Sequence, residues 1–373
     1  MKNYIHIFWC ILYFTACHES SDKSDFLVIP VDVNQNYPVR LSEISEEIQK
    51  VELETSDECL IKFIEQVLLA DDRIFVLDVQ GGGTIHVFDS FGKFRFAINR
   101  KGQGPGEYTS LSCIAIDTKN KHIYAAAQFN QKIIRFDFDG SFIDEHTKMG
   151  YIENIIFEED ILYVFSIDRA RQTGDKTYIT TSTLTQYNRD WQPIDTFDVN
   201  IYKHESNSGS VKPNLDFISK DKQNNLYMYY PDVVPTPKAL QMFGYPIPNY
   251  SLTRDTLYKL DTNHLSPYAK LKFSNENNNV RNKNIAYIHH TSNLLISKYF
   301  NFSDDESNLF CYDFKSQIGK NMKGGFLDDM YNSGLTEIRL LNSQFFYYVK
   351  AVEDIHVNEQ EPNPILYIGK FKE

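Results

Sequence analysis

The chain has 373 residues, of which 42% are hydrophobic and 24% are charged, so its apolar content suffices for one large all-β domain or for two ordinary domains. Its 38 basic and 50 acidic residues give a formal net charge of −12. A nucleic acid would meet repulsion from such a surface rather than gain from counterion release. The composition therefore argues against a DNA or RNA partner.

The first residues, "MKNYIHIFWCILYFTAC", have the features of a targeting segment. Lys2 is followed by an apolar run that is too short to span a bilayer as a helix, and the small residues Thr15 and Ala16 precede Cys17. This order resembles a bacterial lipoprotein signal. We therefore predict a signal peptide over residues 1–16 and lipidation of Cys17. The alternative is a secretory signal that is cleaved elsewhere.

The polar, unpatterned residues 17–25 predict a flexible tether, and residues 26–373 are predicted to form a single domain. The acidic residues near Cys17 also resemble the surface-export signal of Bacteroidota lipoproteins. We expect the protein in the cell envelope at the outer membrane, on the surface or the periplasmic face. The N-terminal lipid would be its only contact with the membrane.

One pattern recurs along the rest of the chain: a polar turn, an apolar strand, a second strand that ends near Asp, and another turn. "DDRIFVLDVQGGGTIHVFDSFGKFRFAI" shows it most clearly, and "NKHIYAAAQFNQKIIRFDFDGSFI" repeats it. The pattern occurs six times, and the first strand of each unit has an aromatic or aliphatic anchor: Phe75, Tyr124, Tyr163, Tyr227, Leu295 and Phe346.

Residues 62–373 divide into six units of 52 residues, near the length of about 40 to 50 residues that is typical of a four-stranded propeller blade. β-branched and aromatic residues dominate the strands, and Gly, Asn and Asp mark the turns. The sequence therefore predicts an all-β, six-bladed β-propeller with four-stranded antiparallel blades. An N-terminal strand, "FLVIPVDV" or "QKVELET", would close the last blade. A solenoid would need a more even period, and two β-sandwiches would not repeat one motif throughout.

The segment "NRKGQGPGEYTS", residues 99–110, connects the outer strand of the first unit to the inner strand of the second. Its glycines allow positive φ and Pro105 stiffens it, so we predict a rigid corner. The segment lacks the spacing of a phosphate-binding loop. We expect the corner to hold Gln103, Glu107 and Tyr108 near the axial opening, where they are candidate ligand contacts.

"FDSFGKFRFAINRKGQGPGEY" is similar to the signature of the six-bladed β-propeller lipoproteins of Bacteroidota, a group of NHL-like and TolB-like propellers. "EISEEIQKVELETSDECLIKFIEQVLLADDRIFVLD" resembles the opening segment of that family, and "RDTLYKLD" resembles one of its later strands. The resemblance implies a propeller fold and an exported, anchored protein. It does not imply a set of catalytic residues.

Polar residues at or just before the predicted inner strands are candidates for a ligand site at the axial mouth. They are Glu107, Glu153, Asn154, Asn214, Asp216, His289, His290, Glu337 and Arg339. Acidic groups in such a ring would favour calcium, while scattered, solvated strand ends are the alternative. Adjacent strand residues point to opposite faces, so His289 and His290 cannot both bind one ion. "DFDGS" at 137–141 lacks the later ligands of a calcium loop and predicts a turn.

The insertion "YPDVVPTPKALQMFGYPIPNYSLTRD" contains five prolines and is longer than a simple turn. Phe243 and Tyr245 are candidate contacts for a sugar ring or a protein partner, because prolines lower the entropy that is lost on binding. The alternative is a cover that packs over one end of the propeller.

The sequence contains no GxSxG, HExxH or CxxC motif. Cys113 and Cys311 lie in apolar runs, where a free cysteine behaves as a small hydrophobic residue. The sequence therefore favours a monomeric, non-catalytic binding module for a glycan, a peptide or an envelope protein, without a required cofactor. A metal-dependent lyase or lactonase is one alternative. A structural or sensory partner of an envelope complex is the other.

Overall fold

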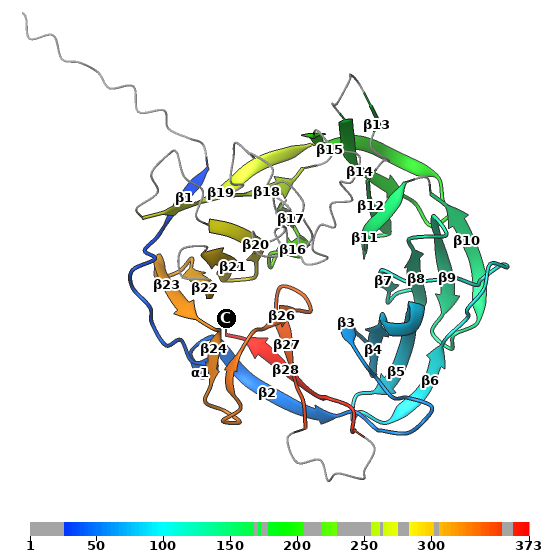
Figure 1. The fold of residues 1–373 in the computed structure, drawn as a ribbon, viewed down its shortest axis with the longest axis horizontal. Coiled ribbons are helices and arrows are strands. Elements are labelled where there is room, and N and C mark those ends of the chain that lie inside the picture. Colours follow the sequence, from blue (N-terminus) through cyan, green and yellow to red (C-terminus); the bar gives the residue numbers. More distant parts are fainter. Residues whose placement is uncertain are drawn as a thin grey trace, which may run out of the picture.

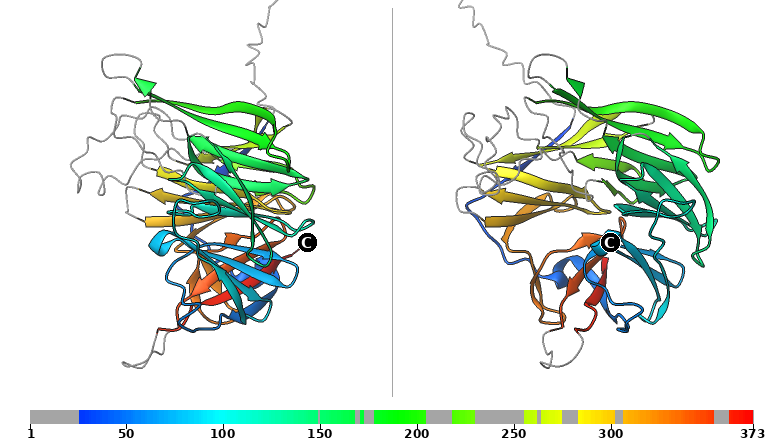
Figure 2. Two further views of the ribbon diagram at one scale, coloured as in Figure 1. Left: turned by 90° about the vertical axis from the view of Figure 1, so that its right-hand side faces the viewer. Right: turned by 45° about the vertical axis from the view of Figure 1, so that its right-hand side comes forward.

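The computed structural model describes residues 26–148, 150–167, 171–172, 178–204, 218–229, 255–261, 264–274, 283–301, 306–352 and 361–372. These residues form a ring of six blades, each a β-sheet, and Figure 1 looks down the axis of the ring. The inner strand of each blade lies beside the axis and the outer strand lies at the rim, and Figure 2 shows the ring from the side. The prediction of an all-β, six-bladed propeller is confirmed.

The first three blades follow one another along the chain, each from axis to rim. The first blade contains β3 (Ile64–Ala70), β4 (Arg73–Asp78), β5 (Thr84–Asp89) and β6 (Phe94–Ile98). The second contains β7 (Cys113–Asp117), β8 (His122–Ala127), β9 (Lys132–Asp137) and β10 (Phe142–Thr147). The third contains β11 (Tyr151–Glu158), β12 (Ile161–Ile167), β14 (Tyr178–Tyr187) and β15 (Pro193–His204), and the short β13 (Arg171–Gln172) pairs with β14.

The last three blades continue the ring. The fourth contains β16 (Ile218–Lys220), β17 (Leu226–Tyr229), β18 (Thr256–Leu260) and β19 (Leu265–Phe273). The fifth contains β20 (Lys283–His290), β21 (Leu294–Asn301), β22 (Glu306–Asp313) and β23 (Ile318–Lys323). A hairpin of β24 (Phe326–Asp328) and β25 (Gly334–Thr336) precedes the sixth blade, which contains β26 (Arg339–Leu340), β27 (Phe345–Lys350) and β28 (Ile365–Phe371).

Burial explains why the repeat could be seen in the sequence. In β4 and β8 every residue except the first is buried, because both faces of a second strand are covered by neighbouring blades. A strand that is covered on both faces is an almost continuous apolar run. The six anchor residues of the repeat all lie on second strands, so the sequence units begin one strand later than the blades.

In four of the blades, an Asp or Asn at or just after the end of the third strand shapes the turn into the outer strand. The carboxylate of Asp89 accepts the main-chain N–H groups of Phe91 at 3.0 Å and Lys93 at 2.9 Å. Equivalent bonds are made by Asp137, Asn188 and Asp313. These side chains replace main-chain acceptors in a tight turn. The predicted turn at residues 137–141 is therefore confirmed.

The N-terminal residues 27–52 form a belt around the rim of three blades (Figure 1, blue). β1 (Leu27–Val31) pairs in parallel with β19 of the fourth blade, and β2 (Ser45–Glu52) pairs antiparallel with β28 of the sixth. The predicted closure of the last blade is confirmed for the "QKVELET" segment. The "FLVIPVDV" segment instead covers the edge of the fourth blade, which was not predicted.

Between these two strands the belt crosses the rim of the fifth blade. The N–H of Tyr37 donates to the carbonyl of Asn321 on β23 at 2.7 Å, and α1 (Leu41–Ile44) follows. Ile29, Val39 and Leu41 are at most 2% exposed, so the belt is part of the hydrophobic core. The belt therefore holds the fourth, fifth and sixth blades together.

The described core is divided among the interfaces between neighbouring blades. Its buried apolar residues form six clusters, one for each pair of adjacent blades. Phe75 and Ile123, for example, pack between the first and second blades. Within the described residues, no helix has the length and apolar character needed to cross a membrane.

Candidate functional site

The axial cavity is a volume of about 510 Å³ at the centre of the ring. All six inner strands contribute to its lining, with Gln66, Ile114, Asn154, Ser219, His289 and Arg339 as one residue from each. Side chains tie neighbouring inner strands together here. The Gln66 amide donates to the carbonyl of Ile114 at 3.0 Å and accepts its N–H at 2.8 Å. The Oγ of Ser219 accepts the N–H of His290 at 2.8 Å.

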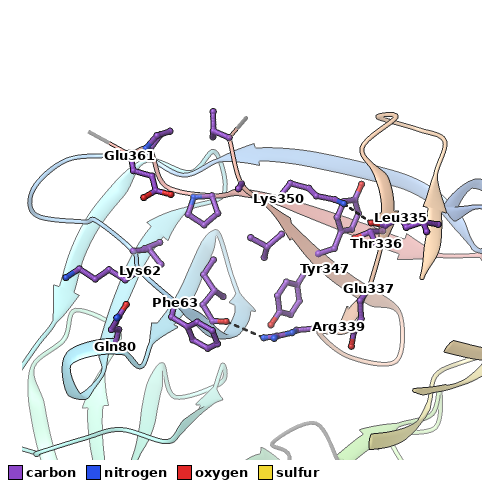
Figure 3. Close-up of a pocket in the computed structure, with 18 of the residues that line it drawn as sticks. Lys62, Phe63, Gln80, Leu335, Thr336, Glu337, Arg339, Tyr347, Lys350 and Glu361 are labelled. Atoms are coloured by element: carbon purple, nitrogen blue, oxygen red, sulfur yellow. Dashed lines mark hydrogen bonds between the residues drawn. The ribbon is translucent and has the colours of Figure 1, made fainter. Parts of the chain in front are cut away.

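The mouth pocket has a volume of about 1000 Å³ and opens between the fifth, sixth and first blades (Figure 3). Its walls come from residues 60–64 and Gln80 of the first blade, and from residues 286–287 and Lys298 of the fifth. Leu335 and Thr336 of the hairpin strand β25, Glu337 after it, and residues 347–352, 361–362 and Pro364 of the sixth blade complete the lining. Arg339 and Tyr347 line both the mouth pocket and the axial cavity. The two volumes are therefore neighbours.

A buried carboxylate holds the first-blade wall of the mouth pocket. Asp78 is only 4% exposed, and its side chain accepts the N–H groups of Lys62 at 2.8 Å, Phe63 at 3.2 Å and Gln80 at 2.9 Å. Three donors on one carboxylate fix the backbone that presents these residues. Gln80 begins the short helix η1 (Gln80–Gly82), so this wall combines a loop and a turn that are fixed to each other.

Asn363 joins the sixth-blade wall to the first blade. It is 3% exposed, and its Oδ1 accepts the N–H of Ile61 at 2.7 Å. Its Nδ2 donates to the carbonyls of Glu54 at 2.7 Å and Cys59 at 2.8 Å. Because every one of these partners is buried or part-buried main chain, the wall is preorganised before any ligand arrives.

Arg339 forms the floor between the two volumes. Its Nη1 donates to the carbonyls of Ile64 at 3.3 Å and Glu65 at 2.9 Å, so a side chain of the sixth blade bonds the inner strand of the first blade. Across the pocket, the Nζ of Lys350 donates to the carbonyl of Leu335 at 3.0 Å. Both cations are oriented by main-chain oxygen atoms (Figure 3).

Three of the predicted site residues lie close together at this floor. Glu337 forms an ion pair with Lys298 at 2.6 Å and accepts the hydroxyl of Tyr287 at 3.3 Å. The Tyr287 ring stacks on His289, with ring centroids 4.4 Å apart. Glu337 of the mouth pocket is thus connected through Tyr287 to His289, and Arg339 lines the axial cavity together with His289.

The corner at residues 99–110 lies elsewhere. Gly106 donates its N–H to Glu145 on the outer strand β10 at 2.9 Å, and the carboxylate of Glu107 accepts the N–H of Gly104 at 2.9 Å. The loop therefore packs against the rim of the second blade, and the expected position near the axial opening is wrong. Gln103, which is exposed, and Glu107 line neither of the two volumes.

Tyr108 belongs to the core between the first and second blades. The residue is completely buried, and its hydroxyl donates to the carbonyl of Ile98 at 3.0 Å. Burial raises the pKa of the phenol to about 12. The expectation that this side chain faces the axial opening is wrong, because the corner needs a large apolar group beneath it.

Glu153 and Asn154 lie on the inner strand of the third blade. Glu153 is the extra residue of a bulge between Ile152 and Asn154, and it is 8% exposed. Burial raises the pKa of its carboxyl to about 9, so the side chain is neutral at pH 7. Asn154 lines the axial cavity.

His289 and His290 point to opposite faces of β20, as predicted. His289 lines the axial cavity, whereas the His290 ring stacks on Tyr227 and on Phe314 in the interface between the fourth and fifth blades. The Nε2 of His290 lies 3.0 Å from the hydroxyl of Tyr268. Burial lowers the pKa of this imidazole to about 4, so it is neutral at pH 7.

The remaining predicted residues lie outside the described part of the chain. They are Cys17, Asn214, Asp216, Phe243 and Tyr245. Among the described residues, no group of three or more His, Cys, Asp or Glu side chains could hold a metal ion, and calcium stays a prediction.

Cys59, Cys113 and Cys311 are buried free thiols. Burial raises the pKa of Cys113 and of Cys311 to about 12.

Lys62, Phe63 and Lys350 line the mouth pocket but are not among the residues predicted from the sequence. Lys62 and Phe63 immediately precede the inner strand β3. The criterion that selected Glu337, a polar residue just before an inner strand, would have found Lys62 if it had been applied to the first unit, but not the apolar Phe63. Lys350 ends a second strand and reaches the pocket only because the sixth blade packs beside the first. No local signal identifies it.

Three comparisons place this fold among known proteins. The family profile described as "Domain of unknown function (DUF4934)" matches residues 26–371. The crystal structure of a Bacteroides fragilis protein described as exported is similar with a TM-score of 0.62 and 18% identity, and it covers 93% of this chain and 100% of that chain. A DUF4221 family member from Bacteroides vulgatus has a TM-score of 0.48 and 11% identity, with 91% and 99% of the two chains covered. No curated protein matches the chain.

Proposed function

The chain belongs to the DUF4934 family, and we propose that it is an exported, lipid-anchored propeller that binds a ligand in its mouth pocket without catalysing a reaction. The observation that carries the proposal is the pocket itself. It has a volume of about 1000 Å³, and buried Asp78 and Asn363 hold its walls in place. Concave, preformed pockets with few oriented polar groups are the usual binding sites of small ligands.

Binding is favoured over catalysis by the contacts of Glu337, one of the two acids that line the pocket. Glu337 is paired with Lys298 at 2.6 Å and hydrogen-bonded to Tyr287, so both contacts hold its side chain in place. A general acid or base needs a group that is available to exchange a proton with the substrate. The charged groups that line the pocket are better suited to holding a ligand in place.

Export and anchoring are supported by the N-terminal sequence. The segment "MKNYIHIFWCILYFTAC" has the order of a lipoprotein signal, and it lies outside the described residues. The described fold starts at residue 26, nine residues after Cys17, which leaves room for a tether. The similar protein from Bacteroides fragilis is described as exported, which agrees with the proposal.

The anchor is tested with Cys17→Ser. We expect the wild-type protein to incorporate labelled fatty acid and to partition into detergent, and the variant to lose both properties. Retention of both by Cys17→Ser would contradict lipidation at this cysteine.

The binding site is tested by blocking the pocket. Ala351 is exposed and lines the mouth pocket, so Ala351→Trp would fill part of it. Ile194, which is 55% exposed on the rim strand β15, supplies the control Ile194→Trp. In a thermal-shift screen of glycans, peptides and metabolites, ligands that stabilise the wild type and Ile194→Trp should not stabilise Ala351→Trp. The pocket is not the binding site if Ala351→Trp responds to the same ligands.

A further inference from the structure

The mouth pocket has a charge opposite to that of the whole protein. The chain has 38 basic and 50 acidic residues. The described lining has basic residues at Lys62, Lys298, Arg339 and Lys350 and acidic residues at Glu337 and Glu361. A basic recess in an acidic surface attracts anions locally, because low-dielectric walls focus the field of the charges that line them.

The positions of the described charged side chains in the mouth pocket leave two of its lysines without an acidic partner among them. Lys298 and Glu337 cancel each other at 2.6 Å. Among the described residues, neither Lys62 nor Lys350 forms an ion pair with a carboxylate. The bond from Lys350 to the carbonyl of Leu335 directs the ammonium group but leaves its charge in place. Two lysines on different walls are therefore available to an anion.

Two exposed apolar side chains accompany these lysines. Phe63 is 50% exposed on the first-blade wall, and Leu335 is 55% exposed on the opposite side of the pocket (Figure 3). A single exposed apolar residue on a surface needs no explanation. Within a concave pocket, however, an aromatic ring next to a cation forms a surface for a ligand that combines an apolar face with a negative charge.

We propose that the mouth pocket binds a short chain of uronic acids, an oligosaccharide in which each ring carries a carboxylate. The proposal rests on the function proposed above, because it names the ligand class of the same pocket. The apolar face of one sugar ring lies on Phe63, and carboxylates lie at Lys62 and Lys350. The exposed amide of Gln80 forms hydrogen bonds with the sugar hydroxyls.

An acidic peptide fits the pocket less well. A bound peptide must satisfy the N–H groups of its main chain, commonly with main-chain carbonyls of the receptor. The carbonyls of Ile64 and Leu335, two residues that line the mouth pocket, already accept hydrogen bonds from Arg339 and Lys350. These two carbonyls are thus less available to the main chain of a peptide, while the pocket offers a uronate two cations and an aromatic face.

The test is calorimetric titration of the detergent-solubilised mature protein with trimers of galacturonic, glucuronic and mannuronic acid. The methyl esters of the same trimers keep the rings and remove the charge. The variants are Lys62→Met, which loses no described hydrogen bond of the side chain, and Lys350→Met. Lys93→Met, on an exposed turn of the first blade, is the control.

We expect at least one acidic trimer to bind, with at least tenfold weaker binding for its methyl ester and for each pocket variant. Lys93→Met should bind like the wild type. Equal binding of acid and ester would overturn the inference while leaving a binding pocket. The inference also fails if a hexaglutamate peptide binds in preference, or if no uronate binds while neutral ligands still depend on Ala351. If no ligand of the screen depends on Ala351, the proposed function fails as well.

Discussion

Arg339 and Glu65 join the last blade to the first: Nη1 of Arg339 on β26 donates a hydrogen bond of 2.9 Å to the carbonyl of Glu65 on β3. The same nitrogen also bonds the carbonyl of Ile64 at 3.3 Å. Arg339 therefore bridges the seam of the ring, where the first and last blades meet, near the axis. At the rim of the sixth blade, β2 supplies the outer strand.

We expect Arg339→Met to lower the free energy of unfolding by about 1 to 3 kcal/mol, because hydrogen bonds from a charged donor are lost at two carbonyls. Urea unfolding followed by tryptophan fluorescence measures this change. Lys62→Met removes a cation from the same pocket without breaking a described bond between blades. It should change stability by less than about 0.5 kcal/mol. Equal stability of the two variants would show that Arg339 does not hold the seam.

The second prediction concerns the contribution of the N-terminal belt to stability. Ile29 on β1 is completely buried against the fourth blade, whereas its neighbour Val28 is 42% exposed. Ile29→Ala should cost about 2 to 5 kcal/mol, since it leaves a cavity in a packed interface. Val28→Ala should cost much less. If thermal melts of the two variants coincide, β1 is not part of the cooperative fold.

The corner at residues 99–110 makes a third prediction. Gly106 has φ of +71°, and a Cβ atom there would lie 2.7 Å from the ring of Phe142. Gly104 does not have positive φ, and its Cβ would meet only the side chain of Glu107, whose nearest atom is a carboxylate oxygen at 3.1 Å. Gly106→Ala should therefore lower the free energy of unfolding by at least about 1 to 3 kcal/mol. Gly104→Ala should lower it by clearly less. Thermal melts of the two variants measure this difference.

Glu107→Gln is the matched test of charge in this corner. The glutamine keeps an oxygen that can accept the N–H of Gly104, so we expect normal stability. Ligands of the mouth pocket should bind this variant like the wild type. A folded Glu107→Gln protein that loses its ligand would place the binding site at the corner instead.

The raised pKa of Glu153 predicts that the stability of the protein depends on pH. Its folded-state pKa is about 9, above the ordinary 4.5, so the folded state favours the protonated acid. The stability from this preference is fully present below pH 4.5 and is lost as the pH rises towards 9. We expect Glu153→Gln, which mimics the neutral acid, to match the wild type near pH 4.5 and to be more stable at pH 8. The advantage is at most about 1.4 kcal/mol per pH unit.

His290 provides an internal check on that measurement. Its folded-state pKa of about 4 lies below the ordinary 6.5, so its effect has the opposite direction. Stability is lost as the pH falls from 6.5 towards 4, in the wild type and in Glu153→Gln alike. The difference between the two proteins should therefore grow only with rising pH. A difference that is constant from pH 4.5 to 8 would show that Glu153 is ionised in the folded state.

Much of the fold could be predicted because the blade is a local unit. The apolar runs around Phe75 and Tyr124 reflect strands that are covered on both faces, and the residues Asp89 and Asp137 shape the turns beside them. Strand and turn preferences act over a few neighbouring residues, so they are readable in order along the chain. The six repeats of one such pattern are enough to predict the number of blades.

The candidate site was only partly predictable, because local strand and turn preferences do not determine which side chains from different blades meet. Glu337, Arg339 and His289 were chosen from their positions at inner strands, and they do meet near the axis. The same criterion selected Glu107, which packs within its own loop at the rim instead. The order of a strand within its blade indicates its distance from the axis, but it does not indicate which side chain a neighbouring loop turns inward.

The sequence by itself determined the six-bladed fold and a strand for closing the last blade, because both follow from local patterns and from the need to cover a sheet edge. Only the tertiary structure decided where β1 lies, since Leu27 pairs with Ala269 across most of the chain. It also decided the mouth pocket, where Asn363 bonds Ile61 over a separation of 302 residues. Contacts between such distant residues depend on the closed ring, whose geometry is set by the packing of all six blades together.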